Sequence, residues 1–424
     1  MRIRLISMAT AALPLALLPA ATAHAAPEGV RTAHVLPAND GWASADGGTT
    51  GGAGADAAHT YTVATWDEFK QALKDGGDAP KVIRVRGTLD GLGGKSCEDF
   101  ATDGYTLDAY LAAYDPKTWG TAQPSGPHEE ARAASADAQG EQIKAYVPAN
   151  TTIVGLGRGA RVLGGSLQIK DTDNVVVRTL TFEDAFDCFP QWDPTDGDGG
   201  AWNSEYDNLV VYGSTHVWID HNTFTDGRRP DSQQPFYYGQ LFQQHDGELD
   251  VVRGADLVTV SWNAFTDHDK TLMIGNSDSA GATDRGKLRV TLHHNLFRDI
   301  VERAPRVRFG QVDAYNNHFV VAAQGYAYSF GIGLESRLVA EKNTFALPGG
   351  VSAAQILKKW KDAPVTTRDN YVNGARMDLL AAHNTANPGN PLREEAGWTP
   401  TLRTRVDHPR VVPALVTGRA GAPR

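Results

Sequence analysis

Val217-Trp-Ile-Asp-His-Asn222-Thr-Phe224 is the stretch that decides the fold, because its pattern returns along the chain. Each copy begins with residues whose character alternates with a period of two, as in a β-strand. An asparagine follows, and a phenylalanine comes two positions after it. The other copies are Val258-Thr-Val-Ser-Trp-Asn263-Ala-Phe265, Val290-Thr-Leu-His-His-Asn295-Leu-Phe297, Val312-Asp-Ala-Tyr-Asn-Asn317-His-Phe319 and Leu338-Val-Ala-Glu-Lys-Asn343-Thr-Phe345. Val175–Phe182 fits the same frame with Leu180 in place of the asparagine. A repeat of this kind indicates structural units that stack on one another.

The spacing of the repeats predicts an all-β solenoid. Successive asparagines of the repeat lie 41, 32, 22 and 26 residues apart. Short strands at a recurring spacing, without helical patterns between them, favour a single-stranded right-handed parallel β-helix whose larger gaps are long loops on one face. Asparagine tolerates the left-handed conformation at each bend, and its amide can bond to the copy in the next coil. The alternative, ordinary turn residues of a β-sandwich, explains five identical frames poorly.

Residues 1–25 have the pattern of a secretory signal peptide. Arg2 and Arg4 supply positive charge, an apolar run follows, and Ala23-His24-Ala25 offers small residues for cleavage. A membrane anchor is the alternative, but the run is shorter than the roughly 20 residues of a spanning helix and contains prolines. We therefore expect a secreted, extracellular protein with no membrane partner.

The rest of the chain divides into a short extension and one domain. Residues 26–57 are rich in Gly, Ala, Ser and Thr, which predicts a flexible N-terminal extension. Residues 58–424 form the β-helix domain. A capping-box pattern, Thr65-Trp-Asp-Glu68, precedes apolar residues at helical spacing and predicts a short N-terminal helix that caps the solenoid.

Charge and cysteine content limit the possible partners. The net charge of −10 argues against nucleic acid as a partner, and we expect a monomer. Negative charge also disfavours an acidic polymer, unless a metal ion or local basic residues reverse the sign at the site. Cys97 and Cys188 are the only cysteines, and either a disulfide or two buried thiols fit the sequence.

Three aspartates are candidate metal ligands. Asp207 precedes an apolar strand, and Asp246 and Asp250 flank Gly247 in a long gap of the repeat. Oxygen ligands from separate loops suit Ca²⁺, which accepts irregular geometry. Aspartates in loops are also common as turn formers or solvated charges, so these residues alone leave both interpretations open.

Basic residues occupy similar positions within the next two coils of the predicted solenoid. They are Lys270 and the pair Arg303 and Arg308. The two arginines are an odd number of residues apart, so a straight strand would point them to opposite faces, and Pro305 predicts a bend. The alternative is that these arginines form surface ion pairs with acids such as Asp299 and Glu302.

Seven stretches, in this order, carry a resemblance to a known family. They are Pro148–Gly155, Phe189–Asp196, Tyr206–Asn208, Val217–His221, His245–Asp250, Asp267–Lys270 and Val301–Gly310. On these stretches the chain from about Ala58 to Leu402 resembles the first polysaccharide lyase family, in particular the bacterial pectate lyases. The resemblance implies a calcium-dependent lyase that cleaves α-1,4-linked polygalacturonate by β-elimination to 4,5-unsaturated oligogalacturonates.

The resemblance also implies roles for particular residues. Asp207, Asp246 and Asp250 would hold the Ca²⁺, and Arg303 would be the catalytic base. Lys270 and Arg308 would bind the substrate. Arginine normally stays protonated above about pH 12, so we expect its surroundings to lower the pKa of Arg303. For Trp218, Asp220 and His221 we favour hydrogen bonding and packing over catalysis.

Three other functions compete with this one. A pectin lyase would act on methyl-esterified polymer and would not need a bridging cation. A polygalacturonase would use paired carboxylates as acid and base. A non-catalytic β-helix carbohydrate-binding protein would explain the repeat but not the convergence of acidic and basic residues.

Overall fold

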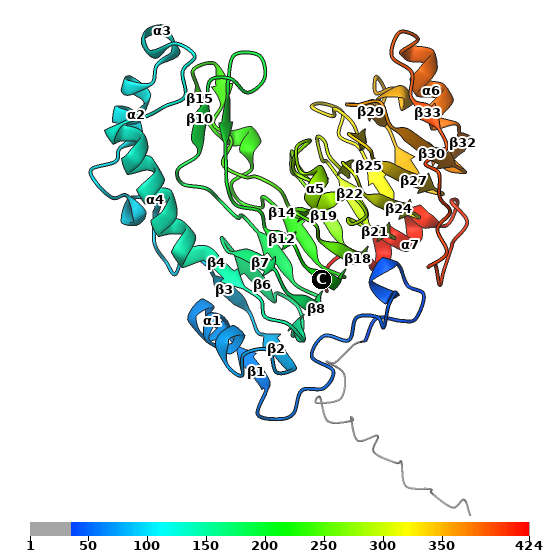
Figure 1. Ribbon diagram of the computed structural model, residues 1–424, viewed down its shortest axis with the longest axis horizontal. Helices are drawn as coiled ribbons and strands as arrows, with labels where there is room; N and C mark the ends of the chain where they lie inside the picture. Colours follow the sequence, from blue (N-terminus) through cyan, green and yellow to red (C-terminus); the bar gives the residue numbers. More distant parts are fainter. Residues whose placement is uncertain (1–34, 424) are drawn as a thin grey trace, which may run out of the picture. The chain divides into compact units, whose positions relative to one another are not determined.

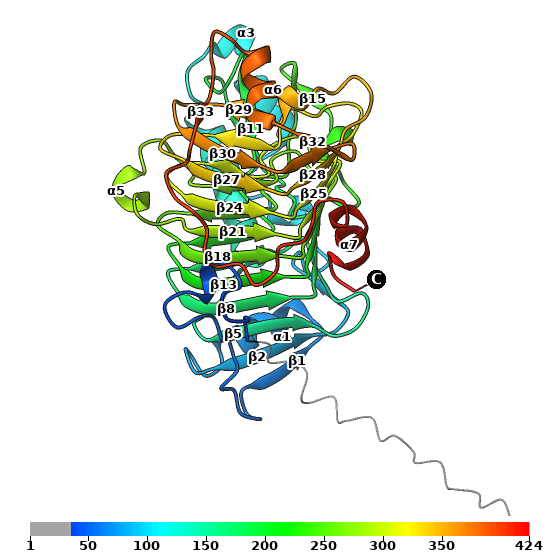
Figure 2. The ribbon, with the colours of Figure 1, turned by 90° about the vertical axis from the view of Figure 1, so that its right-hand side faces the viewer.

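The computed structural model describes residues 35–423, and within them the chain folds as a parallel β-helix (Figure 1). The predicted signal peptide lies outside the described residues. Three sheets run along the solenoid. Along most of the solenoid, each coil contributes one strand to each sheet. In Figure 2 the strands β8, β13, β18, β21, β24, β27 and β30 of one sheet stack in sequence order, as the repeat predicts.

Sheet A is 11-stranded and contains the first half of each repeat. Its strands, in spatial order, are β1 (Thr60–Val63), β2 (Lys81–Val85), β5 (Thr151–Gly155), β8 (Asp173–Arg178), β13 (Thr215–Asp220), β18 (Asp256–Ser261), β21 (Val290–His293), β24 (Gln311–Tyr315), β27 (Arg337–Glu341), β30 (Pro364–Arg368) and β33 (Arg393–Glu394). All of its neighbouring strands pair in parallel.

Sheet B is 10-stranded and follows sheet A after the asparagine bend. Its strands are β3 (Thr88–Asp90), β6 (Arg161–Leu163), β9 (Thr181–Glu183), β14 (Thr223–Thr225), β19 (Ala264–Thr266), β22 (Leu296–Arg298), β25 (His318–Val320), β28 (Thr344–Ala346), β31 (Asn370–Val372) and β32 (Ala375–Met377). The last pair is antiparallel, so the regular stacking of this sheet ends there.

Sheet C is 8-stranded and completes the coils. Its strands are β29 (Leu357–Lys359), β26 (Phe330–Ile332), β23 (Arg306–Val307), β20 (Leu272–Ile274), β17 (Leu249–Val252), β12 (Leu209–Tyr212), β7 (Ser166–Lys170) and β4 (Lys144–Tyr146). The long gaps of the repeat lie before these strands, so sheet C borders the insertions.

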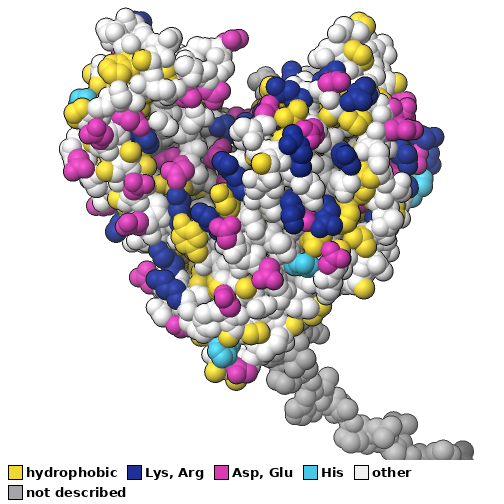
Figure 3. Space-filling model, viewed as in Figure 1, with side chains coloured by type: hydrophobic (Ala, Val, Ile, Leu, Met, Phe, Trp, Pro, Cys, Tyr) yellow, Lys and Arg dark blue, Asp and Glu magenta, His cyan; other side chains and the backbone are white. Residues whose placement is uncertain are grey.

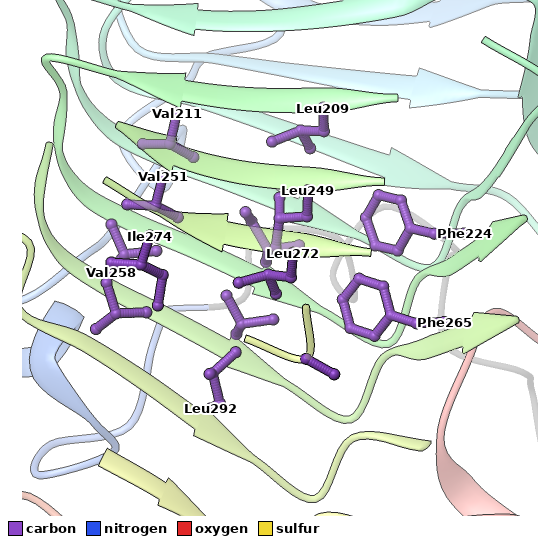
Figure 4. Packing of buried hydrophobic residues seen from close by; sticks show 14 of the residues in the cluster. Leu209, Val211, Phe224, Leu249, Val251, Val258, Phe265, Leu272, Ile274 and Leu292 are labelled. Atoms are coloured by element: carbon purple, nitrogen blue, oxygen red, sulfur yellow. The ribbon is translucent and has the colours of Figure 1, made fainter. Parts of the chain in front are cut away.

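The interior of the solenoid is apolar and layered. Leucine, isoleucine and valine from facing sheets fill it, as the labelled residues of Figure 4 show. The phenylalanines of the repeat stack coil on coil; the rings of Phe224 and Phe265 are 5.0 Å apart and nearly parallel, at 7°. This periodic burial is the main stabilising contribution to the fold.

The predicted ladder of asparagine amides is confirmed. Asn295 Nδ2 donates to Asn317 Oδ1 at 2.9 Å, and Asn263 Nδ2 donates to Asn295 Oδ1 at 3.2 Å. Asn370 continues the ladder, although its stretch lacks the repeat's phenylalanine. The left-handed residue is the one before each asparagine, such as His294 at φ 56°, and not the asparagine itself. The preceding residue makes the bend, which turns the amide inward to the neighbouring coils.

Asn295→Ala is expected to lower the free energy of unfolding by about 3 kcal/mol, measured by urea denaturation. The buried amide bonds Asn263 and Asn317 and also donates to Val260 O at 2.9 Å. Its removal leaves several buried polar groups without partners, which costs roughly 1–3 kcal/mol each. Asn390→Ala, at an exposed loop position, is the matched control and should change stability by less than about 0.5 kcal/mol. Equal stability of the two variants would contradict this role for the ladder.

The N-terminal segment differs from its prediction. Residues 35–57 are not a flexible extension, because Leu36 and Ala43 are buried against Trp218 on the outer face of sheet A. The 3-10 helix η2 (Trp42–Ser44) is held there, with Ala43 N donating to Thr259 Oγ1 at 3.0 Å. The Gly- and Ala-rich composition predicted flexibility. In the structure, small residues allow this segment to lie close against the strands of sheet A.

The opening helix is confirmed, whereas the six further α-helices of residues 35–423 were not predicted. Helix α1 (Trp66–Lys74) begins with the Thr65–Glu68 capping box. The insertion between β3 and β4 contains α2 (Leu107–Ala113), α3 (Pro116–Trp119) and α4 (Pro127–Ile143). The buried face of α4 is made of small and polar residues such as Ala131 and Ser135, so it leaves no apolar periodicity in the sequence.

The insertions build a wall beside sheet C. The hairpins β10 (Gln191–Asp193)–β11 (Ala201–Asn203) and β15 (Phe236–Tyr237)–β16 (Gln240–Leu241) pack with α2 through an aromatic cluster that includes Trp192, Trp202 and Tyr110. A Cys97–Cys188 disulfide ties the start of this insertion to the segment before β10, which decides between the two states that the sequence left open. The short helices α5 (Gly281–Asp284), α6 (Leu379–Ala386) and α7 (Val412–Arg419) complete the fold.

Candidate active site

The outer face of sheet C brings most of the predicted site residues together. Asp250 of β17 is in register with Met273 of β20, and Met273 is in register with Arg306 of β23. Their strand neighbours Leu249 and Val251 point into the core, so this row points outward. Figure 3 shows that the surface is hollowed between the wall of α2, β10 and β15 and the C-terminal coils.

Asp207 and Asp250 converge on Gly247. Gly247 N donates to Asp207 Oδ1 at 2.8 Å. A Cβ atom at position 247 would lie 2.7 Å from Asp207 Oδ1 and 2.8 Å from Asp250 Oδ1, so only glycine leaves room between these oxygens. Asp250 Oδ1 also accepts a hydrogen bond from Met273 N at 2.9 Å, which fixes its direction.

The electrostatics of this group favour a cation. Burial raises the pKa of Asp207 well above its usual range, and the charges of Asp250 and Asp246 raise it further. Burial and the charge of Asp246 raise the pKa of Asp250 to about 7. Carboxylates that oppose one another's ionisation in this way are stabilised by a divalent cation, and oxygen is the donor that Ca²⁺ prefers.

Lys270 and Arg303 lie beside the carboxylates. Lys270 Nζ is 3.8 Å from Asp246 Oδ1, and Lys270 forms a parallel bridge with Glu302 of the next coil. Arg303 Nε donates to Glu302 Oε1 at 2.8 Å. The backbone of Arg303 is left-handed, with φ 61°, and this change of direction gives the bend that Pro305 indicated in the sequence.

The pKa of Arg303 differs from its prediction. Burial is the largest single effect and lowers it, but Glu302, Asp246, Tyr328 and Asp250 together outweigh burial, and the pKa is raised above its usual value. Glu302, which the sequence offered as an ion-pair partner of these arginines, has the largest effect among the charges that raise it. A cation at the carboxylates would offset part of this effect, because it neutralises Asp246.

Arg308 borders the same site from the far side of Met273. Its Nη1 contacts Met273 Sδ at 3.4 Å and donates to Gly275 O at 2.8 Å, while Nε donates to Asp278 Oδ1 at 2.7 Å. Asp278 was not singled out in the sequence, since it lies in a loop far from any motif. Both arginines therefore form ion pairs, Arg303 with Glu302 and Arg308 with Asp278, as the alternative interpretation proposed. These ion pairs hold the two side chains at the edge of the hollow beside sheet C.

A buried network of acids and histidines lies beneath the loop that carries Asp246. Among residues 35–423, one set of three His, Cys, Asp or Glu side chains has its ligand atoms all within 4.8 Å of one another, and it is Asp226, Asp231 and His245. His245 Nδ1 is 2.7 Å from Asp231 Oδ1, and Nε2 is 3.1 Å from Asp184 Oδ1.

The histidine of this set forms ion pairs with the acids around it. Burial lowers the pKa of His245, but its hydrogen bonds to Asp184 and Asp231 outweigh burial and raise it to about 9. The network supports the segment that begins at His245, and sequence analysis missed it because its members lie far apart in the chain.

Trp218, Asp220 and His221 have the packing and hydrogen-bonding role that the sequence favoured. They lie on β13 of sheet A and at its end, whereas the acidic and basic residues lie on sheet C. Asp220 Oδ1 accepts from Ser261 Oγ at 2.6 Å, and Trp218 Nε1 donates to the same hydroxyl at 3.0 Å.

Comparisons with known proteins agree with this architecture. A family model described as pectate lyase matches residues 12–110 and 121–391. The pectate lyase of Bacillus subtilis (strain 168) is 44% identical over 98% of both chains. Pectate lyase E of Dickeya dadantii (strain 3937) is 38% identical over 81% of this chain and 77% of its own length. A solved pectate lyase bound to a hexasaccharide superimposes with a TM-score of 0.88 at 43% identity, over 93% of this chain and 99% of that one.

These findings define the class of protein as a polysaccharide lyase built on a parallel β-helix. The chain belongs to the pectate lyase family, as the resemblance in the sequence implied. None of the helices between residues 35 and 423 has the length and apolar character that crossing a membrane requires.

Proposed function

We propose that this protein is a secreted pectate lyase that cleaves polygalacturonate by calcium-assisted β-elimination. The observation that carries the proposal is the grouping of Asp207, Asp246 and Asp250 beside Lys270 and Arg303 on one face of sheet C. A similar pectate lyase, 42% identical with a TM-score of 0.87, is described as acting by anti β-elimination. Another was solved with a hexasaccharide bound.

The donor set fits Ca²⁺. Asp207, Asp246 and Asp250 would hold the ion, because oxygens of Asp207 and Asp250 converge beside Gly247 and the charge of Asp246 opposes the ionisation of both. When bound, the ion would supply positive charge that stabilises the negative charge developing beside the sugar carboxylate in the transition state. This accounts for an acidic protein that acts on an acidic polymer.

Arg303 is the residue that would remove the C5 proton. Glu302 holds its Nε, so the two terminal nitrogens are the ones that can face the substrate. As the C5–H bond breaks, Arg303 takes the proton, the bond's electrons form the C4=C5 double bond, and the C4–O bond breaks, with solvent water supplying the proton for the leaving oxygen. Lys270 would bind the carboxylate of the reacting sugar, since it lies next to Asp246. Arg308, fixed by Asp278, would bind a neighbouring carboxylate.

The test of this function is the product formed from polygalacturonate with added Ca²⁺. We expect ultraviolet absorbance from a 4,5-unsaturated uronide to rise with time, because only a lyase makes the double bond. New reducing ends without this absorbance would indicate a hydrolase. Activity confined to methyl-esterified pectin would indicate a pectin lyase, and binding without cleavage would indicate a carbohydrate-binding protein.

Secretion is part of the proposal and has its own test. Residues 1–25 are proposed as the signal peptide, and residues 58–424 as the β-helix domain. Protein recovered from the culture medium should begin at Ala26, as read by N-terminal sequencing. A mature chain that retains Arg2 and Arg4 would contradict the signal peptide.

A further inference from the structure

The outward row of sheet C continues beyond the candidate active site. Arg306 of β23 is in register with Gly331 of β26, and Gly331 is in register with Lys358 of β29. Neighbouring strands lie about 4.8 Å apart, so Lys358 is roughly 10 Å from Arg306 along the solenoid. Trp360 follows directly after β29.

Trp360 is an exposed aromatic residue with two cations against it. Its side chain is 40% accessible, although most large apolar side chains of the described residues are buried. The Arg306 guanidinium carbon lies 4.1 Å from the indole centroid, and Lys358 Nζ lies 5.6 Å from it. Gly331 permits this arrangement, because a Cβ there would lie 3.0 Å from Arg306 Cγ.

The positive charges of this group are not compensated. Within residues 35–423, neither Arg306 nor Lys358 has a carboxylate within 4.0 Å, whereas Lys359 and Lys361 pair with Asp362 and Asp278. Arg306 Nε is buried without a hydrogen-bond partner. An exposed indole beside unpaired cations, continuous with a site for an acidic polymer, is complementary to an acidic sugar.

We propose that Trp360, Arg306 and Lys358 form a distal subsite along β23 to β29, which binds unesterified galacturonate units beyond those at the bond that is cleaved. The indole offers an apolar surface to the C–H groups of a sugar ring, and the two cations bind sugar carboxylates. The inference rests on the proposed function and specifies which part of the polymer the C-terminal coils recognise. Through Lys358, strand β29 would then favour long polygalacturonate chains that are not esterified.

The test compares oligogalacturonates of different length. Trp360→Ala and Lys358→Ala should each raise KM for hexagalacturonate and for the polymer about five- to tenfold, with kcat unchanged, because they remove binding that is equal in the ground and transition states. Kinetics on trigalacturonate should change much less, since a trimer that spans the scissile bond has fewer units left to extend over β26 and β29. A partly methyl-esterified hexamer should show a smaller effect of Lys358→Ala.

Controls separate this subsite from folding and from the proposed function. Lys74→Ala removes a positive charge from the exposed end of α1 and should leave KM unchanged for every substrate. Trp360→Phe keeps an aromatic ring and should fall between wild type and Trp360→Ala, at unchanged Tm. An unchanged KM for the hexamer, or an equal rise for trimer and hexamer, would overturn the distal subsite. A wild-type protein that forms no unsaturated product would instead overturn the proposed function.

Discussion

Arg303→Lys is expected to lower kcat on polygalacturonate by about a thousandfold or more, with little change in folding or in substrate affinity. A guanidinium held at Nε by Glu302 presents a terminal nitrogen in a fixed position. Lysine is a flexible point charge and cannot keep both the contact to Glu302 and a nitrogen at C5. Initial rates of unsaturated product, together with binding of hexagalacturonate by calorimetry, measure the two effects separately.

The matched control is Arg298→Lys, on β22 of sheet B, which should leave the rate unchanged. Thermal unfolding should be the same for both variants. Near-normal turnover of Arg303→Lys would reject Arg303 as the base and move attention to Lys270.

The pH profile provides an independent test of the same residue. The neutral form of Arg303 must take the proton, and nearby carboxylates raise its pKa, so the neutral fraction increases with pH throughout the accessible range. The rate should therefore still rise above about pH 8, where carboxylate and histidine bases have already lost their protons. A flat profile between about pH 6 and 10 would contradict an arginine base.

The fold could be predicted because its information is local and repeated. Alternation, bend and phenylalanine recur within eight residues, and each copy adds the same layer to the core. The helix α4 escaped prediction, since its buried residues are small and the disulfide and aromatic cluster around it involve partners far away in sequence. The packing of residues 35–57 on sheet A was equally invisible, because it depends on a surface formed by several coils.

The candidate site was predictable to a different extent. Its acidic and basic residues stood in recognisable motifs, and coil stacking explains why residues so far apart meet. Glu302 was among the ion-pair partners that the sequence offered for these arginines, whereas Asp278 and the network around His245 were not predictable, since they act only through contacts made in the folded chain. The same is true of Trp360, whose significance comes from its position beyond Arg306 on sheet C.

Removal of Ca²⁺ with a chelator is expected to abolish cleavage of polygalacturonate, by about a hundredfold or more, and added Ca²⁺ should restore it. Asp207, Asp246 and Asp250 would otherwise repel the sugar carboxylates. Asp246→Ala should mainly raise the concentration of Ca²⁺ required, because two ligands remain. Full activity in chelator would contradict the calcium proposal.

The thermal stability of the protein gives a test of the proposed calcium site that does not depend on catalytic activity. Without the ion, the pKa of Asp250 is about 7, above its value of about 3.9 in an unfolded chain. A raised pKa contributes stability that is fully present below about pH 4 and is lost as pH rises through about 7. Since Ca²⁺ binds the ionised carboxylates, the gain in Tm on adding Ca²⁺ should grow between about pH 5 and 8.

Asp250→Asn separates repulsion from metal binding. The amide keeps an oxygen for Met273 N but carries no charge, so this variant without Ca²⁺ should unfold at a higher temperature than wild type at about pH 8. It should also lose most of the Tm gain from Ca²⁺. Asp369→Asn, at an exposed ion pair with Arg376, is the matched control and should keep the full gain. In the wild type, a carboxylate buried as deeply as Asp250 is stable in its charged form only with a cation beside it. If Asp250→Asn kept the full Tm gain from Ca²⁺, Asp250 would therefore not be a ligand of the metal site.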